Sequence, residues 1–318
     1  MRIVHLERNT MGLDIDTDCY KDFGEVVSYP SFDQSKTIER IKDADILLIN
    51  KTILDRYTLS KAPNLKLICV MATGYDNVDI AYCKEHGIAV ANAGHYSTTA
   101  VVQHTFMIGL GLMGNLIHYY HFVEGGEYGK QADFSSFDVP MQEIAEKTWG
   151  IVGMGEIGCG VAKAASAFGC KVIFFSPTGK SKCTEYERVS FEELCRQSDI
   201  ISLHCPLSDL TRNLFGRDAF GMMKESAYLI NVARGGVVDQ DALAEALKNG
   251  KIAGAALDVL AREPIAADNP LAEIKDAGKL IITPHNAWAY VEARQRDVDI
   301  TYENIKAFLA GKEKNRVV

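Results

Sequence analysis

Three polar side chains, Arg234, Glu263 and His285, could together bind and protonate a small organic acid. Arg234 follows the apolar run 229–232 and His285 follows the run 280–283, so each would lie where a buried strand ends. A guanidinium can bind a carboxylate through two parallel hydrogen bonds, and an imidazole titrates near neutral pH. A carboxylate beside the imidazole would favour the imidazolium and fix its orientation. Hydride transfer to or from a 2-hydroxy acid requires these groups besides a nicotinamide.

Each of the three side chains also has a purely structural explanation. A loop arginine commonly forms a surface ion pair, a histidine after a proline commonly caps the backbone, and a glutamate before a proline is commonly solvated. Spacing alone leaves both interpretations of Arg234, Glu263 and His285 open.

A glycine-rich turn at residues 153–158 (Gly-Met-Gly-Glu-Ile-Gly) predicts a dinucleotide site, although glycines also mark ordinary turns. The turn follows the apolar run 148–152 and opens a helical pattern. Gly153 would permit the tight turn, Gly155 would let the backbone approach a pyrophosphate, and Gly158 would let helix and strand pack closely. The anion would then bind the N–H groups at the helix N-terminus.

The loop after the next strand leaves the choice between NAD and NADP open. An acidic residue is expected there, about 20 residues beyond the glycines, to bind the adenosine ribose. The strand at 171–175 is instead followed by Ser176, Thr178 and Lys180. The two hydroxyls can form hydrogen bonds, and Lys180 or Lys182 could either pair with a 2′-phosphate or be solvated.

Short apolar runs alternate with helical patterns along the chain and predict the elements that position these residues. The predicted strands are residues 3–6, 25–29, 45–49, 67–70 and 88–91, followed by 148–152, 171–175, 199–203, 228–232, 254–259 and 280–283. Continuous apolar runs are typical of strands buried on both faces, and alternation with helices is typical of parallel sheets. The pattern predicts an α/β fold with two doubly wound parallel-sheet domains.

The domain boundary is predicted near Ser97. Residues 97–99 could cap the apolar helix 100–117, and the amphipathic segment 294–309 could return to the first domain after the last strand. We therefore expect a substrate domain of residues 1–97 and 290–318, and a dinucleotide-binding domain of residues 98–289.

Composition narrows the class of protein. A length of 318 residues suits two domains, and 34 Lys and Arg against 42 Asp and Glu argue against binding to nucleic-acid phosphates. The eight cysteines form no Cys-x-x-Cys pair and no Cys/His cluster, so we expect reduced thiols, no metal site and a cytoplasmic location. The N-terminus lacks a signal-peptide core. Segment 100–117 contains Gln103, His104 and Asn115, which favours a buried helix over a membrane span.

Ordered motifs spread over nearly the whole chain resemble the D-isomer-specific 2-hydroxyacid dehydrogenase family. They are residues 72–79, 149–158, 204–207, 229–236, 256–259, 263–264 and 283–285. The resemblance implies a Rossmann-type cofactor domain inserted in a flavodoxin-like substrate domain. It further implies that the chain is a homodimer, because the family's helix matching 100–117 contributes to a two-fold interface; the alternative is simple burial of this helix.

The resemblance also implies roles for individual residues. Arg234 would bind the substrate carboxylate, His285 would be the acid/base and Glu263 its partner. Backbone N–H groups at Gly74 and Tyr75 would also bind the carboxylate. Lys51 would select the substrate side chain, unless it is a surface lysine. Ser97 and about Tyr290 would be hinges, and closure about them would exclude water from the site. The implied cofactor contacts are Thr73, Glu156, Ile157, Ser176, Cys205, Val232, Ala233, Asp258 and Ala287.

The chain departs from the family pattern at two positions. Ser176 occupies the position where NAD-preferring members usually carry Asp, which casts doubt on strict use of NAD. Trp288 occupies a position where many relatives have smaller residues, and it could narrow the substrate pocket or pack the hinge. The C-terminal segment 303–312 resembles the glycerate dehydrogenase and hydroxypyruvate reductase branch.

These observations predict reduction of a short 2-keto acid, hydroxypyruvate or glyoxylate first, by NADH or NADPH. In reverse the enzyme would oxidise D-glycerate. Reduction of pyruvate or larger keto acids, as in D-lactate dehydrogenases, is the nearest alternative. Formate dehydrogenases pair the histidine with Gln, so Glu263 argues against that branch. A cofactor-sensing interaction protein without turnover, similar to the co-repressors of this fold, is a more distant alternative.

Overall fold

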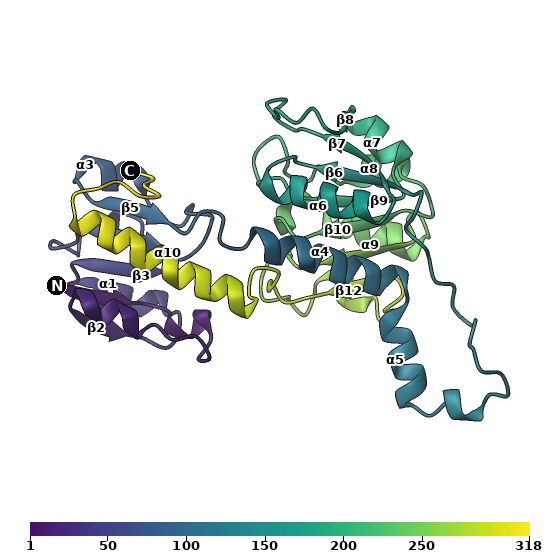
Figure 1. Cartoon of the computed structure of the whole chain (residues 1–318), viewed down its shortest axis with the longest axis horizontal. Coiled ribbons are helices and arrows are strands. Elements are labelled where there is room, and N and C mark those ends of the chain that lie inside the picture. Colours follow the sequence, from purple (N-terminus) through teal and green to yellow (C-terminus); the bar gives the residue numbers. More distant parts are fainter. The chain divides into compact units, whose positions relative to one another are not determined.

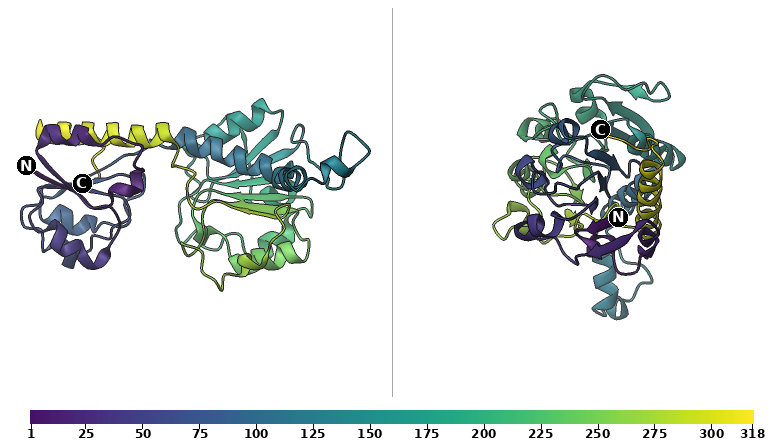
Figure 2. Two further views of the ribbon diagram at one scale, coloured as in Figure 1. Left: turned by 90° about the horizontal axis from the view of Figure 1, so that it is seen from below. Right: turned by 90° about the vertical axis from the view of Figure 1, so that its left-hand side faces the viewer.

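The computed structural model describes all residues from Met1 to Val318, and they form two compact units. The first unit comprises Met1–Ser97 and Trp288–Val318, and the second comprises Thr98–Ala287. Each unit contains one parallel sheet with helices on both faces (Figures 1 and 2). The predicted class, two doubly wound α/β domains, is confirmed.

The sheet of the first unit has five parallel strands in the order β2-β1-β3-β4-β5. Their bounds are β1 Arg2–His5, β2 Glu25–Ser28, β3 Ile46–Ile49, β4 Leu67–Val70 and β5 Ala89–Asn92. The alternation of side chains along a strand divides β3 between two cores. Ile46 and Leu48 pack with one cluster, whereas Leu47 and Ile49 pack with the other.

Helices cover both faces of this sheet. They are α1 Thr37–Ile41, α2 Arg56–Leu59, α3 Ile80–Glu85 and α10 Val291–Leu309, with 3₁₀ turns at Arg8–Met11, Asp18–Phe23 and Gln34–Lys36. The C-terminal helix α10 lies along one face (Figure 2), where its buried Val298 and Ile305 contact the core that includes Ile46 and Leu48. The amphipathic segment predicted at 294–309 therefore does return to the first unit.

The second unit has seven parallel strands in the order β12-β11-β10-β9-β6-β7-β8. Their bounds are β6 Thr148–Val152, β7 Lys171–Phe175, β8 Glu187–Arg188, β9 Ile200–Leu203, β10 Tyr228–Asn231, β11 Gly254–Leu257 and β12 Leu280–Ile282. Every predicted strand is present to within two residues at each end. Strand β8 was not predicted, because a two-residue strand of Glu and Arg carries no apolar signal.

The helices of the second unit also divide between the two faces of its sheet. They are α4 Thr98–Met113, α5 Leu116–Glu124, α6 Glu156–Ala167, α7 Phe191–Gln197, α8 Arg217–Met222 and α9 Gln240–Lys248, with 3₁₀ turns at Tyr128–Lys130, Gly235–Val237 and Pro270–Glu273. Ile230 packs into the core that contains residues of α4 and α6, and its neighbour Leu229 packs into the core formed with α7, α8 and α9.

The single helix predicted at 100–117 is wrong, because the segment forms two helices. Asn115 adopts a left-handed conformation with φ 49°, and its side chain donates to the carbonyl of Pro140, so the chain turns between α4 and α5. No single helix here has the length and apolar composition to cross a membrane; α4 and α5 pass that criterion only as a pair bent by 62°.

The second crossing between the units lies two residues earlier than predicted. Trp288 and Ala289 belong to the first unit. The Trp288 ring makes an edge-on contact with Tyr96 at a centroid distance of 6.3 Å, and Arg294 donates to the carbonyl of Ala289 at 2.8 Å. Both partners lie in the first unit, which explains the shift.

Candidate active site

The glycine turn after β6 has the geometry of a phosphate-binding site. Gly153 has φ +94°, and a Cβ at this position would lie 2.9 Å from the backbone of His204 and Cys205. A Cβ on Gly158 would lie 2.1 Å from the carbonyl oxygen of Gly153, so only glycine lets α6 begin this close to the turn. A Cβ on Gly155 would instead meet open space.

The N-terminus of α6 is suited to bind an anion. Gly155 is its N-cap and has no side chain with which to accept from the first N–H groups of the helix, which include those of Glu156 and Ile157. Such N–H groups and the helix dipole favour negative charge. The residues present therefore fit the pyrophosphate of a dinucleotide.

The first part of the loop after β7, residues 176–182, contains hydroxyls and lysines and no acid. Ser176 is buried, and its hydroxyl accepts a long hydrogen bond from the N–H of Ser181 at 3.4 Å, whereas Thr178 and Lys180 are exposed. Arg188 on β8 donates to the carbonyl of Gly179 at 2.9 Å. The structure thus adds a guanidinium to a loop where only lysines were predicted.

The backbone around Arg234 is held in place by the side chain of Asn231. The buried side chain of Asn231 donates to the carbonyl of Arg234 at 3.0 Å and accepts from the N–H of Ala233 at 3.0 Å. The exposed guanidinium of Arg234 donates to the carbonyl of Ala233 at 2.8 Å. A Cβ on Gly235 would lie 1.9 Å from the backbone of Leu260, so this glycine lets the Arg234 loop contact the loop that leads to Glu263.

Glu263 and His285 are in direct contact. Oε2 of Glu263 lies 2.5 Å from Nδ1 of His285, and Oε1 accepts from the N–H of Leu260 at 2.8 Å. Both side chains are partly exposed, at 35% for Glu263 and 28% for His285. Since Nδ1 faces the carboxylate, Nε2 is the ring nitrogen that would exchange a proton with a substrate.

The turn that carries His285 is held by the buried carboxylate of Asp258. His285 has φ +53°, a left-handed conformation that strains most side chains. Asp258 accepts from the N–H of Asn286 at 3.0 Å, from the N–H of Ala287 at 2.8 Å and from the Thr283 hydroxyl at 2.6 Å. Behind this cluster, Nε2 of His104 lies 3.0 Å from the Thr283 oxygen.

These hydrogen bonds also set the charge of Asp258. Burial alone would raise the pKa of this carboxyl, but the bonds from His104, Thr283 and the N–H groups of Ala287 and Asn286 outweigh burial and lower the pKa. The carboxylate predicted to contact cofactor is therefore ionised and already engaged in orienting the His285 turn.

The other predicted cofactor residues of the second unit lie where its parallel strands end. Cys205 follows β9 and is buried, and burial raises its pKa to about 11, so its thiol is neutral. Val232 and Ala233 follow β10, and Ala287 follows the His285 turn. Because carboxyl ends of parallel strands share one edge of a sheet, these residues lie on the edge that carries the glycine turn, Arg234 and His285.

The remaining predicted residues belong to the first unit. Gly74 and Tyr75 follow β4, and Lys51 follows β3, again at carboxyl ends of strands. The Thr73 hydroxyl donates to the carbonyl of Gly94 at 2.5 Å. Trp288 packs on Tyr96, next to Ser97, which agrees with the alternative that it packs near the hinge. That Trp288 narrows the substrate pocket stays a prediction.

Sequence reasoning missed several residues that hold the site. Asn231 lies inside the motif 229–236, so its position beside Arg234 was a usable signal. Neither Arg188 nor His104 had a signal in the sequence, because each is brought to the site by tertiary packing. His104, for example, is 179 residues from Thr283 along the chain.

Known proteins resemble the chain over its whole length. Residues 106–287 match the family model for the NAD binding domain of D-isomer specific 2-hydroxyacid dehydrogenases. The glycerate dehydrogenase of Methylorubrum extorquens is 39% identical over 320 residues, which cover 99% of this chain and 98% of that protein. The hydroxypyruvate reductase of Blautia hydrogenotrophica is 37% identical over 310 residues, 96% of this chain and 95% of that protein.

A solved structure extends the comparison to a bound cofactor. An acyclic imino acid reductase in complex with NADPH and D-Arg has a TM-score of 0.87 to this chain, with 28% identity and full coverage of both chains. The match to an NAD binding domain and this NADPH complex both support a nicotinamide dinucleotide as the cofactor.

Proposed function

Because this chain belongs to the D-isomer specific 2-hydroxyacid dehydrogenase family, we propose that it reduces a short 2-keto acid, hydroxypyruvate or glyoxylate first, to the D-2-hydroxy acid. It is an oxidoreductase that uses NAD or NADP. The observation that carries the proposal is the 2.5 Å contact between His285 and Glu263, on the sheet edge that also carries Arg234 and the glycine turn.

The proposed mechanism assigns one task to each polar group. Arg234 binds the substrate carboxylate and polarises the adjacent carbonyl. Glu263 accepts the Nδ1–H of His285, which orients the ring and balances the positive charge of the imidazolium. Nε2 of His285 then gives its proton to the keto oxygen, and takes it back in the reverse direction. The bound nicotinamide supplies the hydride that the carbonyl carbon accepts.

Residues of both units are proposed to bind the ligands. In the second unit, the N–H groups of Glu156 and Ile157 would hold the pyrophosphate. In the first unit, the N–H groups of Gly74 and Tyr75 would bind the substrate carboxylate, and Lys51 would contact the substrate side chain. Thr73, Val232, Ala233 and Ala287 are proposed cofactor contacts, Trp288 a proposed substrate contact, and Ser97 with Tyr290 the proposed hinges.

We further propose that the enzyme prefers NADPH. The buried Ser176 provides a hydroxyl where a ribose-binding acid would repel a 2′-phosphate, and Arg188 is held beside Gly179 of the same loop. A guanidinium is well suited to bind a phosphate through paired hydrogen bonds. The exposed Lys180 adds positive charge at the loop.

The test is consumption of reduced cofactor by the purified protein with hydroxypyruvate, glyoxylate and pyruvate, with NADH and NADPH in parallel. We expect fast turnover with hydroxypyruvate or glyoxylate and slower turnover with pyruvate. The reverse order would favour a D-lactate-type enzyme. Tight binding of NADH without turnover of any keto acid would favour the cofactor-sensing alternative.

We also propose that the protein is a homodimer, on a different surface from the one predicted. Most apolar side chains of α4 are buried in its own unit against α6, β10 and β11, so burial explains that helix. The segment that follows, residues 116–141, which we call the arm, has no buried residue in α5. Its most exposed apolar side chains, between 59% and 90% exposed, are Leu116, Tyr120, Val123, Phe134, Phe137 and Met141.

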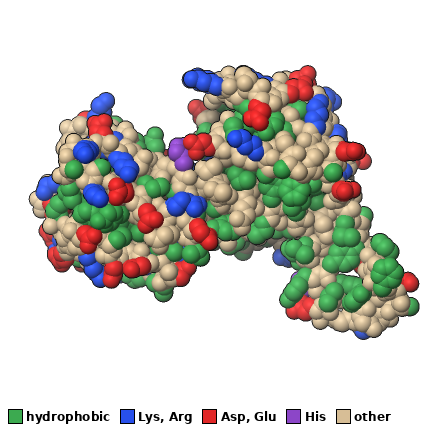
Figure 3. Space-filling view, viewed as in Figure 1, with side chains coloured by type: hydrophobic (Ala, Val, Ile, Leu, Met, Phe, Trp, Pro, Cys, Tyr) green, Lys and Arg blue, Asp and Glu red, His purple; other side chains and the backbone are tan.

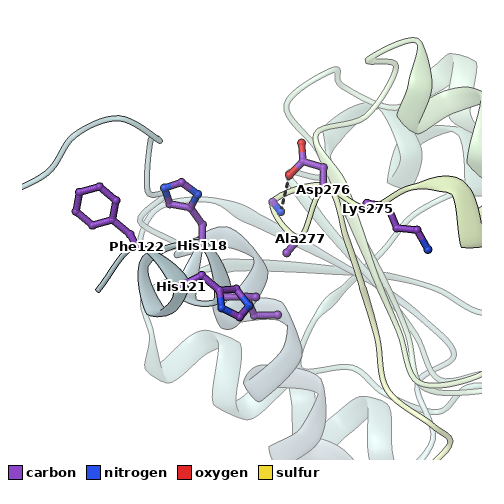
Figure 4. A pocket seen from close by; sticks show the side chains of 8 residues that line it. His118, His121, Phe122, Lys275, Asp276 and Ala277 are labelled. Atoms are coloured by element: carbon purple, nitrogen blue, oxygen red, sulfur yellow. Dashed lines mark hydrogen bonds between the residues drawn. The ribbon is translucent and has the colours of Figure 1, made fainter. Parts of the chain in front are cut away.

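The arm extends from the second unit (Figures 1 and 2), and apolar side chains cover much of its visible face (Figure 3). A hollow of about 420 Å³ beside α5 is lined by Ile117, His118, His121, Phe122 and residues 275–278 (Figure 4). None of the predicted site residues lines it. An apolar surface of this kind marks an interaction site, and a second arm would match it in chemistry.

A reducing compartment, the cytoplasm, is the proposed location. All eight cysteines are free thiols, and five of them are buried. Thiols in this state persist where glutathione and thioredoxin keep proteins reduced.

A further inference from the structure

We propose that Glu7 and Asn77 are positioning residues that hold the segment 50–52 against the substrate side chain and so favour 2-keto acids with a polar group on C3. The inference rests on the proposed function and adds to it a substrate class. Neither residue belongs to the site described above. Both lie in the first unit, at the carboxyl ends of strands.

Glu7 is a fully buried carboxylate with 0% exposure, on the turn after β1. Oε2 accepts from the N–H of Lys51 at 2.7 Å, and Oε1 accepts from the N–H of Thr52 at 2.5 Å and from the Thr52 hydroxyl. Burial of a charge is unfavourable unless hydrogen bonds compensate it. Both carboxylate oxygens of Glu7 accept hydrogen bonds from Lys51 and Thr52, so the buried charge fixes this short stretch of backbone.

Asn77 holds the same stretch from the other side. Its Nδ2 donates to the carbonyl of Thr52 at 2.8 Å and to that of Asn50 at 3.3 Å. Two N–H groups and two carbonyls of the segment are therefore bound by side chains from the turns after β1 and β4, the strands on either side of β3. The next residue, Ile53, exchanges two further hydrogen bonds with Gln34.

This arrangement links the segment to the proposed carboxylate-binding residues. Asn77 lies three residues after Gly74, in the turn whose N–H groups are proposed to bind the substrate carboxylate. A substrate anchored there has its C2 substituent at a defined distance from the carboxylate. Asn77 joins the turn after β4 to the turn after β3. The exposed Lys51 and the polar Asn50 are therefore held at a fixed distance from the proposed carboxylate-binding N–H groups of Gly74 and Tyr75. An ammonium and an amide favour a hydroxymethyl group over a hydrogen or a methyl group.

The test compares two substrates that differ only at this substituent. Hydroxypyruvate carries a hydroxymethyl group, whereas glyoxylate carries only hydrogen. In Glu7→Gln one oxygen becomes an NH₂ group that faces donors, so the segment must shift. We expect kcat/KM for hydroxypyruvate to fall about tenfold more than kcat/KM for glyoxylate, mainly through KM, with the KM of the cofactor unchanged.

Asp45→Asn is the matched control. Asp45 accepts from the N–H of Arg2 at 2.9 Å and from Lys66 Nζ at 2.8 Å, so it joins neighbouring strands of the same sheet at the opposite edge. This variant should lower Tm and leave the ratio of the two kcat/KM values unchanged. Should Glu7→Gln fail to fold, Thr52→Val removes only the hydroxyl donor and should shift the ratio in the same direction by a smaller factor.

The outcomes separate this inference from the proposed function. If the unsubstituted protein reduces the keto acids but Glu7→Gln and Thr52→Val keep its ratio, the positioning role is overturned and the proposed function stands. The role is also overturned if Asp45→Asn shifts the ratio as far, because general destabilisation would then explain the effect. No turnover of either acid by the unsubstituted protein would overturn both.

Discussion

His285 is the residue on which the proposed chemistry depends most directly. It is held at a left-handed φ by Asp258 and faces Glu263 through Nδ1, so its ring presents Nε2 in one orientation. His285→Gln should lower kcat by about 10²–10⁴-fold, the usual contribution of a general acid/base, and leave the Kd of the cofactor unchanged. Steady-state kinetics and cofactor fluorescence measure the two quantities.

The matched control is His86→Gln in the first unit, where the imidazole stacks on Tyr82. It should retain the unsubstituted kcat. Retention of kcat in His285→Gln would contradict the acid/base assignment.

Arg188 gives the second prediction at the scale of residues. If its guanidinium binds a 2′-phosphate, Arg188→Gln should raise the KM for NADPH about tenfold and leave the KM for NADH unchanged. Lys171→Gln, an exposed cation that faces Glu187 at 3.5 Å at the start of the neighbouring strand, serves as the control and should change neither KM. Equal effects of Arg188→Gln on both cofactors would remove the basis for the proposed preference.

Helix α10 contains a buried acid whose titration should be visible in stability. Burial raises the pKa of Asp297 to about 8, although a hydrogen bond from Thr301 opposes the shift. One carboxylate oxygen, Oδ2, has no partner. An unfolded aspartate has a pKa of about 3.9, so the folded protein binds this proton more tightly than the unfolded chain does. The free energy of unfolding therefore falls as pH rises from about 4 to about 8.

Asp297→Asn should remove this loss. Its Tm should be close to that of the unsubstituted protein at about pH 5 and exceed it by a few degrees at about pH 8, measured by thermal unfolding across that range. Asp299→Asn, on the exposed side of the same helix, should show no such dependence on pH. A constant difference in Tm between Asp297→Asn and the unsubstituted protein would contradict the assignment.

At the scale of elements, apolar patterns predicted strands better than they predicted helix ends. The four residues of β3 form a short apolar run flanked by polar residues, which is typical of a strand, whereas the apolar stretch 100–117 contains only Gly114 and Asn115 as a signal that a helix ends there. The break depends on a hydrogen bond from Asn115 to Pro140, which lies 25 residues further on. Asn tolerates the left-handed conformation locally, but the position of its hydrogen-bond partner cannot be read from a local pattern.

At the scale of the whole molecule, the arm makes the oligomeric state testable. Phe134 and Phe137 are 90% and 85% exposed, so replacing both by serine should weaken the dimer without disturbing a core. Sedimentation should then change from about twice the 35.0 kDa chain mass to the chain mass itself. Phe32→Ser, at 48% exposure in the first unit, should leave the dimer intact.

The sequence by itself determined the two parallel sheets and the glycine turn, and it provided Arg234, Glu263 and His285 as the proposed catalytic residues. Short apolar runs that alternate with helical patterns are typical of buried parallel strands, and three glycines in this spacing after such a run are typical of a phosphate-binding turn. Each of these patterns consists of consecutive residues, so it can be recognised without knowledge of the fold.

Only the tertiary structure decided what holds the reactive groups in place. Asp258 and His104 fix the His285 turn, Arg188 reaches the loop after β7, and Glu7 binds a segment 44 and 45 residues away. Each of these contacts joins segments that are distant along the chain. Their strength depends on separations of about 3 Å, which are set when the whole sheet packs and which no sequence spacing specifies.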